Sequence, residues 1–193
     1  MKKVVLTFGL IAGAIIAVLV WVVAWLCERD LVAFERMEFV GYASMLIALT
    51  MVFFGIKSYR DNYSGGTITF WKGVQVGLLI SLIAGVLYFA GALSYNIANP
   101  GFQAKFIEKY TEFTVGKLRS QGAPQTDIDS ATAEIELMKK LFENPVMFFA
   151  IAMVEILPVG IIVTLISAGL LKRKEVLPAA AKSGESSEFD VIL

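Results

Sequence analysis

The chain has 193 residues, of which 57% are hydrophobic and only 18% are charged, a composition that excludes an ordinary soluble domain and predicts a membrane protein. Its 17 basic and 17 acidic residues cancel, so no excess positive charge favours nucleic acid as a partner. The chain has no histidine and a single cysteine, Cys27, which excludes an internal disulfide framework and most catalytic and metal-binding constellations.

Four apolar runs are each long enough to cross a hydrocarbon core about 30 Å thick, which requires about 20 helical residues. They cover residues 4–26, 39–56, 73–98 and 145–171, and only the last contains a charge, Glu155. The sequence therefore predicts an all-α, polytopic membrane protein with four transmembrane helices. The first run exceeds the apolar core of a signal peptide, about 7 to 15 residues, so we expect it to be retained.

Lysine and arginine predict the orientation of the spans, because these residues concentrate in cytoplasmic loops. With the N-terminus inside, the cytoplasmic side holds nine basic residues, Lys2, Lys3, Lys57, Arg60, Lys72, Lys172, Arg173, Lys174 and Lys182. The outer side holds Arg29 and Arg36 and six more that are spread over the 46 residues from 99 to 144. We therefore expect both termini to lie in the cytoplasm, and residues 172–193 to form a flexible cytoplasmic tail.

Residues 99–144, which follow the three spans of residues 1–98, are expected to form an extracytoplasmic helical hairpin. Gly122 and Pro124 mark its turn, and two apolar stripes recur at helical spacing. The first is Phe102, Phe106, Tyr110 and Phe113, and the second is Ile128, Ala131, Ile135, Met138 and Phe142. Either the stripes pack on each other and cap the bundle, or the aromatic stripe docks a partner or lies in the lipid interface.

Small residues recur every four positions in two spans, and residues at this spacing lie on one helix face. They are Gly9, Gly13 and Ala17 in the first span, and Gly73, Gly77, Ser81 and Gly85 in the third. Such faces let helix backbones approach closely inside a membrane. The sequence therefore predicts tight helix packing at these positions, either within one chain or between chains.

A carboxylate and a proline interrupt the last apolar run, at Glu155 and Pro158. A carboxylate in the middle of a span costs about 3 kcal/mol, so we expect Glu155 to face the bundle interior. Pro158 has no N–H and leaves the carbonyl of Val154 without its helical partner. Glu155 lies ten residues from the outer end of its span, and the same depth falls near Thr50 and Tyr88. We expect Glu155 to bond to Tyr88 or Thr50 and so to join neighbouring spans.

Three stretches carry a family resemblance: FGLIAG near the N-terminus, GYASMLIALTMVFFGIKSYRDNYSGG from Gly41 to Gly66, and ENPVMFFAIAMVEILPVGIIVTLISAGLLKRK from Glu143 to Lys174. They resemble the bacterial membrane family called domain of unknown function 4199, and the resemblance covers nearly the whole chain up to about Lys174. It implies a four-span protein of the Gram-negative inner membrane. It implies no activity, substrate or cofactor.

These observations predict a non-enzymatic accessory or scaffold protein that acts through the hairpin, the loop after the second span, or an oligomer interface. The alternative is a small proton- or ion-coupled transporter or channel centred on Glu155, because an intramembrane carboxylate beside a broken helix is typical of such paths. No pair of nucleophile and base is visible, and we predict neither a cofactor nor a metal site. The expected surroundings are membrane lipid, with another membrane protein or a second copy of the chain as candidate partners and no nucleic acid.

Overall fold

The computed structural model describes residues 1–172, which form six helices. In chain order these are α1 (Lys2–Glu28), α2 (Phe34–Tyr63), α3 (Phe70–Ala98), α4 (Phe102–Ser120), α5 (Gln125–Glu143) and α6 (Pro145–Leu171). Helices α1, α2, α3 and α6 are long and apolar enough to cross a membrane, which confirms the predicted all-α fold with four candidate spans. Except for Lys172, the predicted tail lies outside the described residues.

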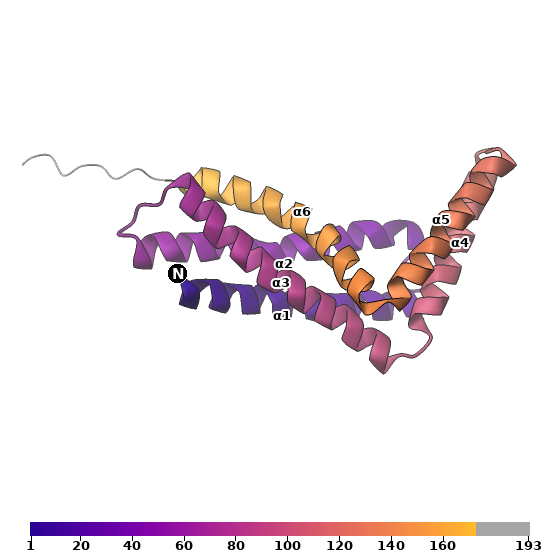
Figure 1. The fold of residues 1–193 in the computed structure, drawn as a ribbon, viewed down its shortest axis with the longest axis horizontal. Helices are drawn as coiled ribbons and strands as arrows, with labels where there is room; N and C mark the ends of the chain where they lie inside the picture. The colour runs from indigo at the N-terminus through magenta and orange to yellow at the C-terminus, as the bar shows by residue number, and fades with distance from the viewer. Residues whose placement is uncertain (173–193) are drawn as a thin grey trace, which may run out of the picture.

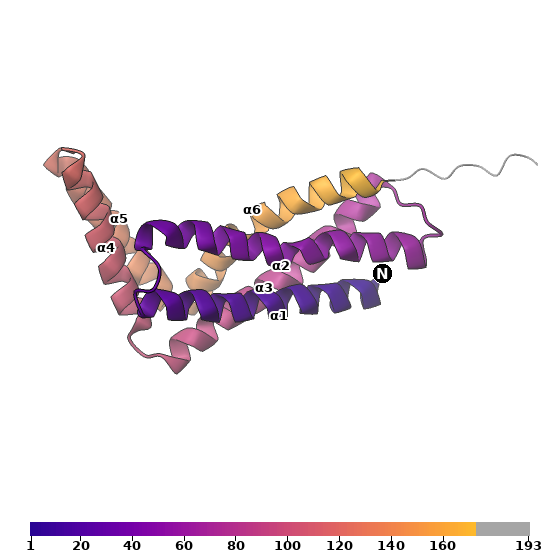
Figure 2. The ribbon, with the colours of Figure 1, turned by 180° about the vertical axis from the view of Figure 1, so that it is seen from behind.

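The four long helices run side by side as a bundle, and the α4–α5 hairpin tilts away from one end of it (Figure 1). We call this end the hairpin end. The start of α1, the connection between α2 and α3, and the last turn of α6 all lie at the other end, which we call the N-terminal end (Figures 1 and 2). The hairpin therefore extends the bundle at one end only.

Local sequence signals explain where several helices begin. The Thr69 side chain accepts a hydrogen bond from the Lys72 backbone N–H at 3.3 Å and caps α3. The Asn144 side chain accepts one from the Val146 N–H at 2.9 Å and caps α6. In the turn between α4 and α5, Gly122 has a φ of +69°, a conformation that glycine adopts without steric cost.

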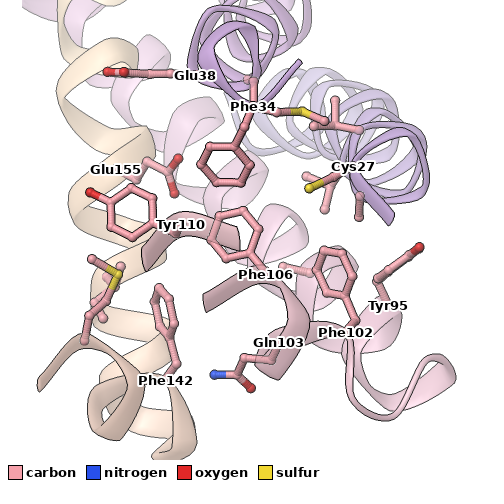
Figure 3. A pocket seen from close by; sticks show the side chains of 18 of the residues that line it. Cys27, Phe34, Glu38, Tyr95, Phe102, Gln103, Phe106, Tyr110, Phe142 and Glu155 are labelled. Atoms are coloured by element: carbon pink, nitrogen blue, oxygen red, sulfur yellow. The ribbon is translucent and has the colours of Figure 1, made fainter. Parts of the chain in front are cut away.

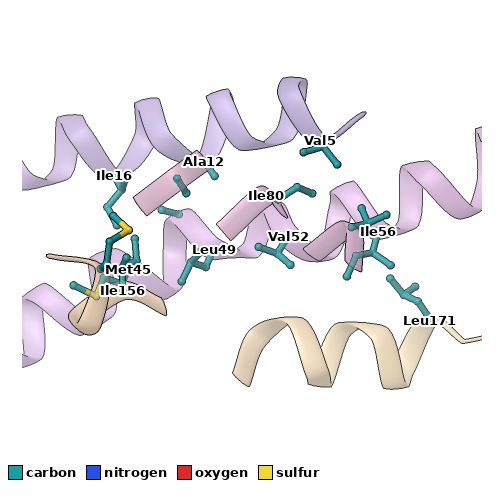
Figure 4. Close-up of a cluster of buried hydrophobic side chains, with 14 of the residues drawn as sticks. Val5, Ala12, Ile16, Met45, Leu49, Val52, Ile56, Ile80, Ile156 and Leu171 are labelled. Carbon is teal, nitrogen blue, oxygen red and sulfur yellow. The ribbon is translucent and has the colours of Figure 1, made fainter. Parts of the chain in front are cut away.

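The four spans share one apolar core at the centre of the bundle. Ile16 of α1, Leu49 of α2, Ile80 of α3 and Ile156 of α6 are each at most 1% exposed (Figure 4). Many other large apolar side chains remain exposed on the outside of the bundle, as expected for surfaces that face lipid. Each span thus has one set of apolar side chains that is buried in the core and another that faces outward.

The small residues of α1 let this helix approach α3 closely. A Cβ atom added at Gly9 would lie 2.9 Å from Cβ of Ile83, and one added at Gly13 would overlap the side chain of Leu87. Real Cβ atoms almost never come this close to a neighbour. The glycines of α1 therefore serve a contact within one chain.

The small residues of α3 serve a second contact on the same chain, against α6. Gly77 shows how tight this contact is, since an added Cβ would lie 2.6 Å from Cγ2 of Thr164. The contact is continuous along both helices: Gly73 faces Ala168, Gly77 faces Thr164, Ser81 faces Gly160, and Gly85 faces Met153. Helix α3 is therefore the central packing element of the bundle, because it contacts both α1 and α6 through small residues.

The α3–α6 contact contains one buried hydroxyl group without a hydrogen-bond partner in the described part of the chain, Oγ1 of Thr164. An unpaired buried polar group costs about 1–3 kcal/mol, and valine has nearly the same shape as threonine. We therefore expect Thr164→Val to raise the melting temperature of the detergent-purified protein. Ser81→Ala is the matched control and should give no gain, because Oγ of Ser81 already donates to the Gly77 carbonyl at 3.0 Å. A lower melting temperature for Thr164→Val would contradict this expectation.

Candidate functional site

A cavity of about 1330 Å³ lies at the hairpin end, and all six helices contribute residues to its lining. Its walls come from the hairpin-side halves of the four spans and from the α4 face that looks toward them. The volume exceeds the range of about 300–1,000 Å³ that is usual for small-molecule pockets. The space is therefore large enough for a sizeable organic molecule.

Apolar side chains line the deep part of this cavity, within the bundle. Ile16 of α1 and Met45 of α2 are buried there, and Ile16 is 1% exposed. Tyr88 of α3 and Glu155 of α6 lie at the same depth, farther from the hairpin end than the other lining residues of their helices. Below them lies the closed core of the bundle. The cavity thus ends inside the bundle, where Tyr88 and Glu155 lie beside apolar side chains.

Glu155 of α6 lies on the wall of this cavity and is bonded to Tyr88 of α3. The Tyr88 hydroxyl group donates a hydrogen bond of 2.7 Å to Oε2 of Glu155. Figure 3 shows the carboxyl group of Glu155 turned into the cavity. The structure therefore brings together two of the residues that depth matching selected, and it gives the carboxyl group a polar partner inside the membrane.

Thr50 does not join this pair, contrary to the expectation from its depth. Its side chain is exposed, and Oγ1 donates a 2.6 Å hydrogen bond to the carbonyl of Ile47 on its own helix. The reason is geometric, since depth fixes a position along the helix axis but leaves the direction of the side chain undetermined. Leu49 takes the inward direction and is fully buried, so the next residue points outward.

Pro158 lies inside α6, which continues without interruption from Pro145 to Leu171. The helix changes direction along its length, and a proline is a common cause of such bends (Figures 1 and 2). Pro158 is exposed on the helix surface and does not line the cavity. Pro158 therefore lies at a bend of α6 and takes no part in the Glu155–Tyr88 pair.

Three further carboxylates line the cavity and were not singled out from the sequence, Glu35 and Glu38 of α2 and Glu112 of α4. The apolar run suggested a helix start at residue 39, whereas α2 begins at Phe34. The earlier start carries Glu35 and Glu38 into the helix, where they face the cavity. The sequence signal for these residues was their position directly before an apolar run, because a transmembrane helix can begin outside the hydrocarbon core.

The aromatic stripe of α4 packs against the bundle. The ring of Phe34 lies 5.6 Å from that of Phe106, 6.0 Å from that of Tyr110 and 5.5 Å from that of Phe113, measured between centroids. Such distances are typical of favourable aromatic pairs. The stripe thus caps the bundle through Phe34, and its rings form part of the cavity wall (Figure 3).

Polar contacts fasten the base of α4 to the end of α1. The Lys109 ammonium group donates hydrogen bonds to Oδ1 of Asp30 at 2.6 Å and to the carbonyl of Cys27 at 3.1 Å. The hydrogen bond to Asp30 raises the pKa of Lys109, so this ammonium group is held in its charged form. The Tyr95 hydroxyl group donates to Oε2 of Glu28 at 2.9 Å and adds a contact between α1 and α3. The hairpin is therefore held by charge as well as by aromatic packing.

Comparison with known proteins places the chain in a family. A family model described as "Protein of unknown function (DUF4199)" matches residues 7–173. The chain belongs to the DUF4199 family. This confirms the resemblance, and the match spans the bundle, the hairpin and every residue that lines the cavity. No curated protein and no solved structure matched in the same comparisons.

Four carboxylates and one ammonium group, that of Lys117, line the cavity of this DUF4199 chain. Within residues 1–172, no group of three or more Cys, Asp and Glu side chains is arranged to hold a metal ion. The lining carboxylates are therefore distributed along the walls.

Proposed function

We propose that this protein is a non-enzymatic integral membrane protein that works by binding a small hydrophobic molecule in the cavity at its hairpin end. The observation that carries this proposal is the Glu155–Tyr88 pair, which places an oriented polar group beside apolar side chains at the inner end of the cavity. Binding sites for small molecules commonly combine apolar walls with a few oriented polar groups. The hairpin lines this space at the end of the bundle and supplies part of its aromatic wall.

An accessory role in the membrane is compatible with this proposal. The protein would then act by binding a ligand, and not by docking a partner protein. A scaffold needs a free surface for its partner. The aromatic stripe of α4 is engaged with Phe34, and the small-residue stripes are engaged within the chain. Another membrane protein or a second copy of the chain would have to bind elsewhere, for example on the lipid-facing surface.

The proposal includes the bacterial inner membrane as the location and the cytoplasm as the compartment of both termini. The distribution of lysine and arginine supports this orientation. The start of α1 and the last turn of α6 lie at the same end of the bundle, which is compatible with it. The cavity then lies in the outer half of the membrane, below an extracytoplasmic hairpin.

A second candidate function, a proton or ion path, is favoured by the intramembrane carboxyl group of Glu155 beside a cavity. A fully buried apolar layer lies between that cavity and the N-terminal end, formed by Val52, Ile56, Val76 and Ile80 at 0% exposure. A conducting path has to open this layer. In proteoliposomes that contain a pH-sensitive dye, we expect equal and negligible proton flux for wild type and Glu155→Gln. Flux that is lost in Glu155→Gln would favour the path over the binding protein.

Filling the cavity tests the binding function directly. Gly41 lines the cavity, and a Cβ atom added there meets nothing within 4 Å, so the ring of Gly41→Phe has room to extend into the space. Gly169 of α6 is equally open but lies outside the cavity, so Gly169→Phe is the matched control. Native mass spectrometry of protein from membranes should detect bound small molecules in wild type and Gly169→Phe and fewer in Gly41→Phe. Equal occupancy in all three proteins would contradict the proposal.

A further inference from the structure

The four spans around the cavity differ in how tightly they pack at the hairpin end. Helix α1 still has a buried residue there at Cys27, and α3 has one at Tyr95. By contrast, no residue is buried in residues 34–44 of α2 or in residues 145–151 of α6. Helices α1 and α3 therefore stay packed as far as the hairpin end, whereas the first turns of α2 and α6 are only loosely packed.

Specific contacts close the sides of the cavity that α3 forms with its neighbours. Toward α1, the indole N–H of Trp21 donates a hydrogen bond of 3.0 Å to Oγ of Ser94. Toward α6, the ring of Phe89 lies 5.4 Å from that of Phe148 and 5.2 Å from that of Phe149, both edge to face. Among the described residues, no hydrogen bond, salt bridge or ring pair joins the first turns of α2 to those of α6. The side between α2 and α6 therefore lacks the contacts that close the others.

The exposure of the lining residues shows the same difference. On α1 and α3 every lining residue is buried or partly buried, whereas Tyr42 of α2 and Glu155 of α6 are exposed, Tyr42 by 46%. Figure 1 shows α6 crossing α2 near the middle of the bundle and then running away from it toward the base of the hairpin. The cavity therefore has a lateral opening, which we define as the space between Tyr42 on α2 and Glu155 on α6 and from there to the hairpin end.

The lateral opening lies mostly at the depth of the lipid tails. Tyr42 on one side of it and Ile151 on the other belong to the apolar runs 39–56 and 145–171. Glu155 lies ten residues after the start of α6, about 15 Å along the helix, which is half of a hydrocarbon core about 30 Å thick. The opening thus extends over the depth of one leaflet, and its outer end reaches the headgroup level and water.

The inner end of the cavity suits a hydrocarbon chain. Ile16, Met45 and Ala152 line it and are buried, and none of them carries a hydrogen-bonding side chain. Water is absent from the hydrocarbon region, whereas a lipid tail that enters from the side gains van der Waals contacts with these walls. The carboxyl group of Glu155 already has the Tyr88 hydroxyl group as its partner, and this bond ties α6 to α3 where the opening ends. The ligand therefore needs no polar group at this depth.

We infer that the cavity opens sideways into the leaflet on the hairpin side and takes up the acyl chain of a membrane lipid between α2 and α6. The headgroup of that lipid stays at the membrane surface, and the end of the chain reaches the apolar residues near Ile16. This inference rests on the proposed binding function and names both the class of ligand and its route of entry.

A phosphatidylcholine that carries a photoreactive diazirine in its acyl chain tests this inference. The full-length protein is placed in phosphatidylcholine vesicles that contain this lipid, the vesicles are irradiated, and mass spectrometry locates the labelled residues. We expect label at Met45 and Ala152, which line the cavity and are each 3% exposed. We expect none at Leu49, which is 0% exposed and does not line it. Val154 is 72% exposed on the outer surface and serves as the reference for contact with lipid.

Filling the cavity should remove the inner label. Gly41 lies beside Tyr42 at the lateral opening, so Gly41→Phe should abolish the label at Met45 and Ala152 and leave it unchanged at Val154. Gly169→Phe, outside the cavity, should keep the wild-type pattern. Label at Met45 that stays at the wild-type level in Gly41→Phe would show that the chain does not enter between α2 and α6.

A small apolar probe, a trifluoromethyl phenyl diazirine, separates the ligand class from the binding function. If this probe labels Met45 and Ala152 but the diazirine lipid does not, the cavity binds small apolar molecules and the inference about the acyl chain is wrong. If neither probe labels these residues, the binding function fails together with the inference. Thermal melting without probe shows whether Gly41→Phe is folded. Tyr42→Trp, which enlarges an exposed side chain at the lateral opening, replaces it if it is not.

Discussion

Gly77→Leu is expected to lower the stability of the protein by about 3 kcal/mol, because leucine at this position overpacks the contact between α3 and α6. The Cβ atom alone would lie 2.6 Å from Cγ2 and 2.8 Å from Oγ1 of Thr164. It would also lie 3.1 Å from Cδ1 of Ile56, so the helix cannot escape by turning toward α2. Relief of these overlaps requires the helices to separate, and separation opens the core on both sides of α3.

Thermal melting of the purified protein in a mild detergent measures this effect, and Gly169→Leu is the control. Gly169 is also a glycine of a span, but an added Cβ there meets nothing within 4 Å. We expect a large fall in melting temperature for Gly77→Leu and little change for Gly169→Leu. Equal melting temperatures for Gly77→Leu and wild type would show that the close approach of α3 and α6 is not real.

Phe34→Ala is expected to loosen the hairpin from the bundle. The Phe34 ring contacts three rings of α4, and its loss removes the shared partner of that stripe. Removal of a buried phenylalanine side chain costs about 3–5 kcal/mol, and about half of this applies to Phe34 because it is only partly buried. Hydrogen–deuterium exchange measured by mass spectrometry should be faster in residues 102–120 of the variant, while the spans remain protected.

Phe39→Ala is the control for this experiment, since Phe39 lies on the same helix and is 76% exposed. It removes the same side chain from a surface that faces outward, and exchange in α4 should stay at the wild-type level. Unchanged exchange in both variants would mean that the contacts of Phe34 do not hold the hairpin. In that case the aromatic wall of the cavity would have no fixed position.

Length and composition were sufficient to predict the four spans, because the thickness of the hydrocarbon core sets a minimum apolar length. The ends of the helices were harder to predict. Helix α2 continues on both sides of its apolar run, from Phe34 to Tyr63, since backbone hydrogen bonding does not stop where the membrane core stops. The small-residue stripes predicted close packing, but spacing alone does not indicate which helix lies opposite.

Depth matching predicted the candidate site only in part. It selected Tyr88, which bonds to Glu155, and also Thr50, which points away from it. Depth is one coordinate, whereas a contact also depends on how each helix is rotated about its axis. The cavity itself was not predictable, because it arises from the position of α4 against Phe34, which involves residues far apart in the chain.

The direction of residue 155 is the central claim, and cysteine reactivity measures it most directly. In a Cys27→Ala background, Glu155→Cys and Val154→Cys place a thiol at neighbouring positions of α6, one lining the cavity and one 72% exposed on the outer surface. In nanodiscs, a water-soluble cationic methanethiosulfonate reagent should modify Glu155→Cys rapidly and Val154→Cys slowly. Adding Gly41→Phe should slow the reaction of Glu155→Cys. Slow modification of Glu155→Cys and of Val154→Cys alike would mean that residue 155 faces lipid, and the binding cavity would be refuted.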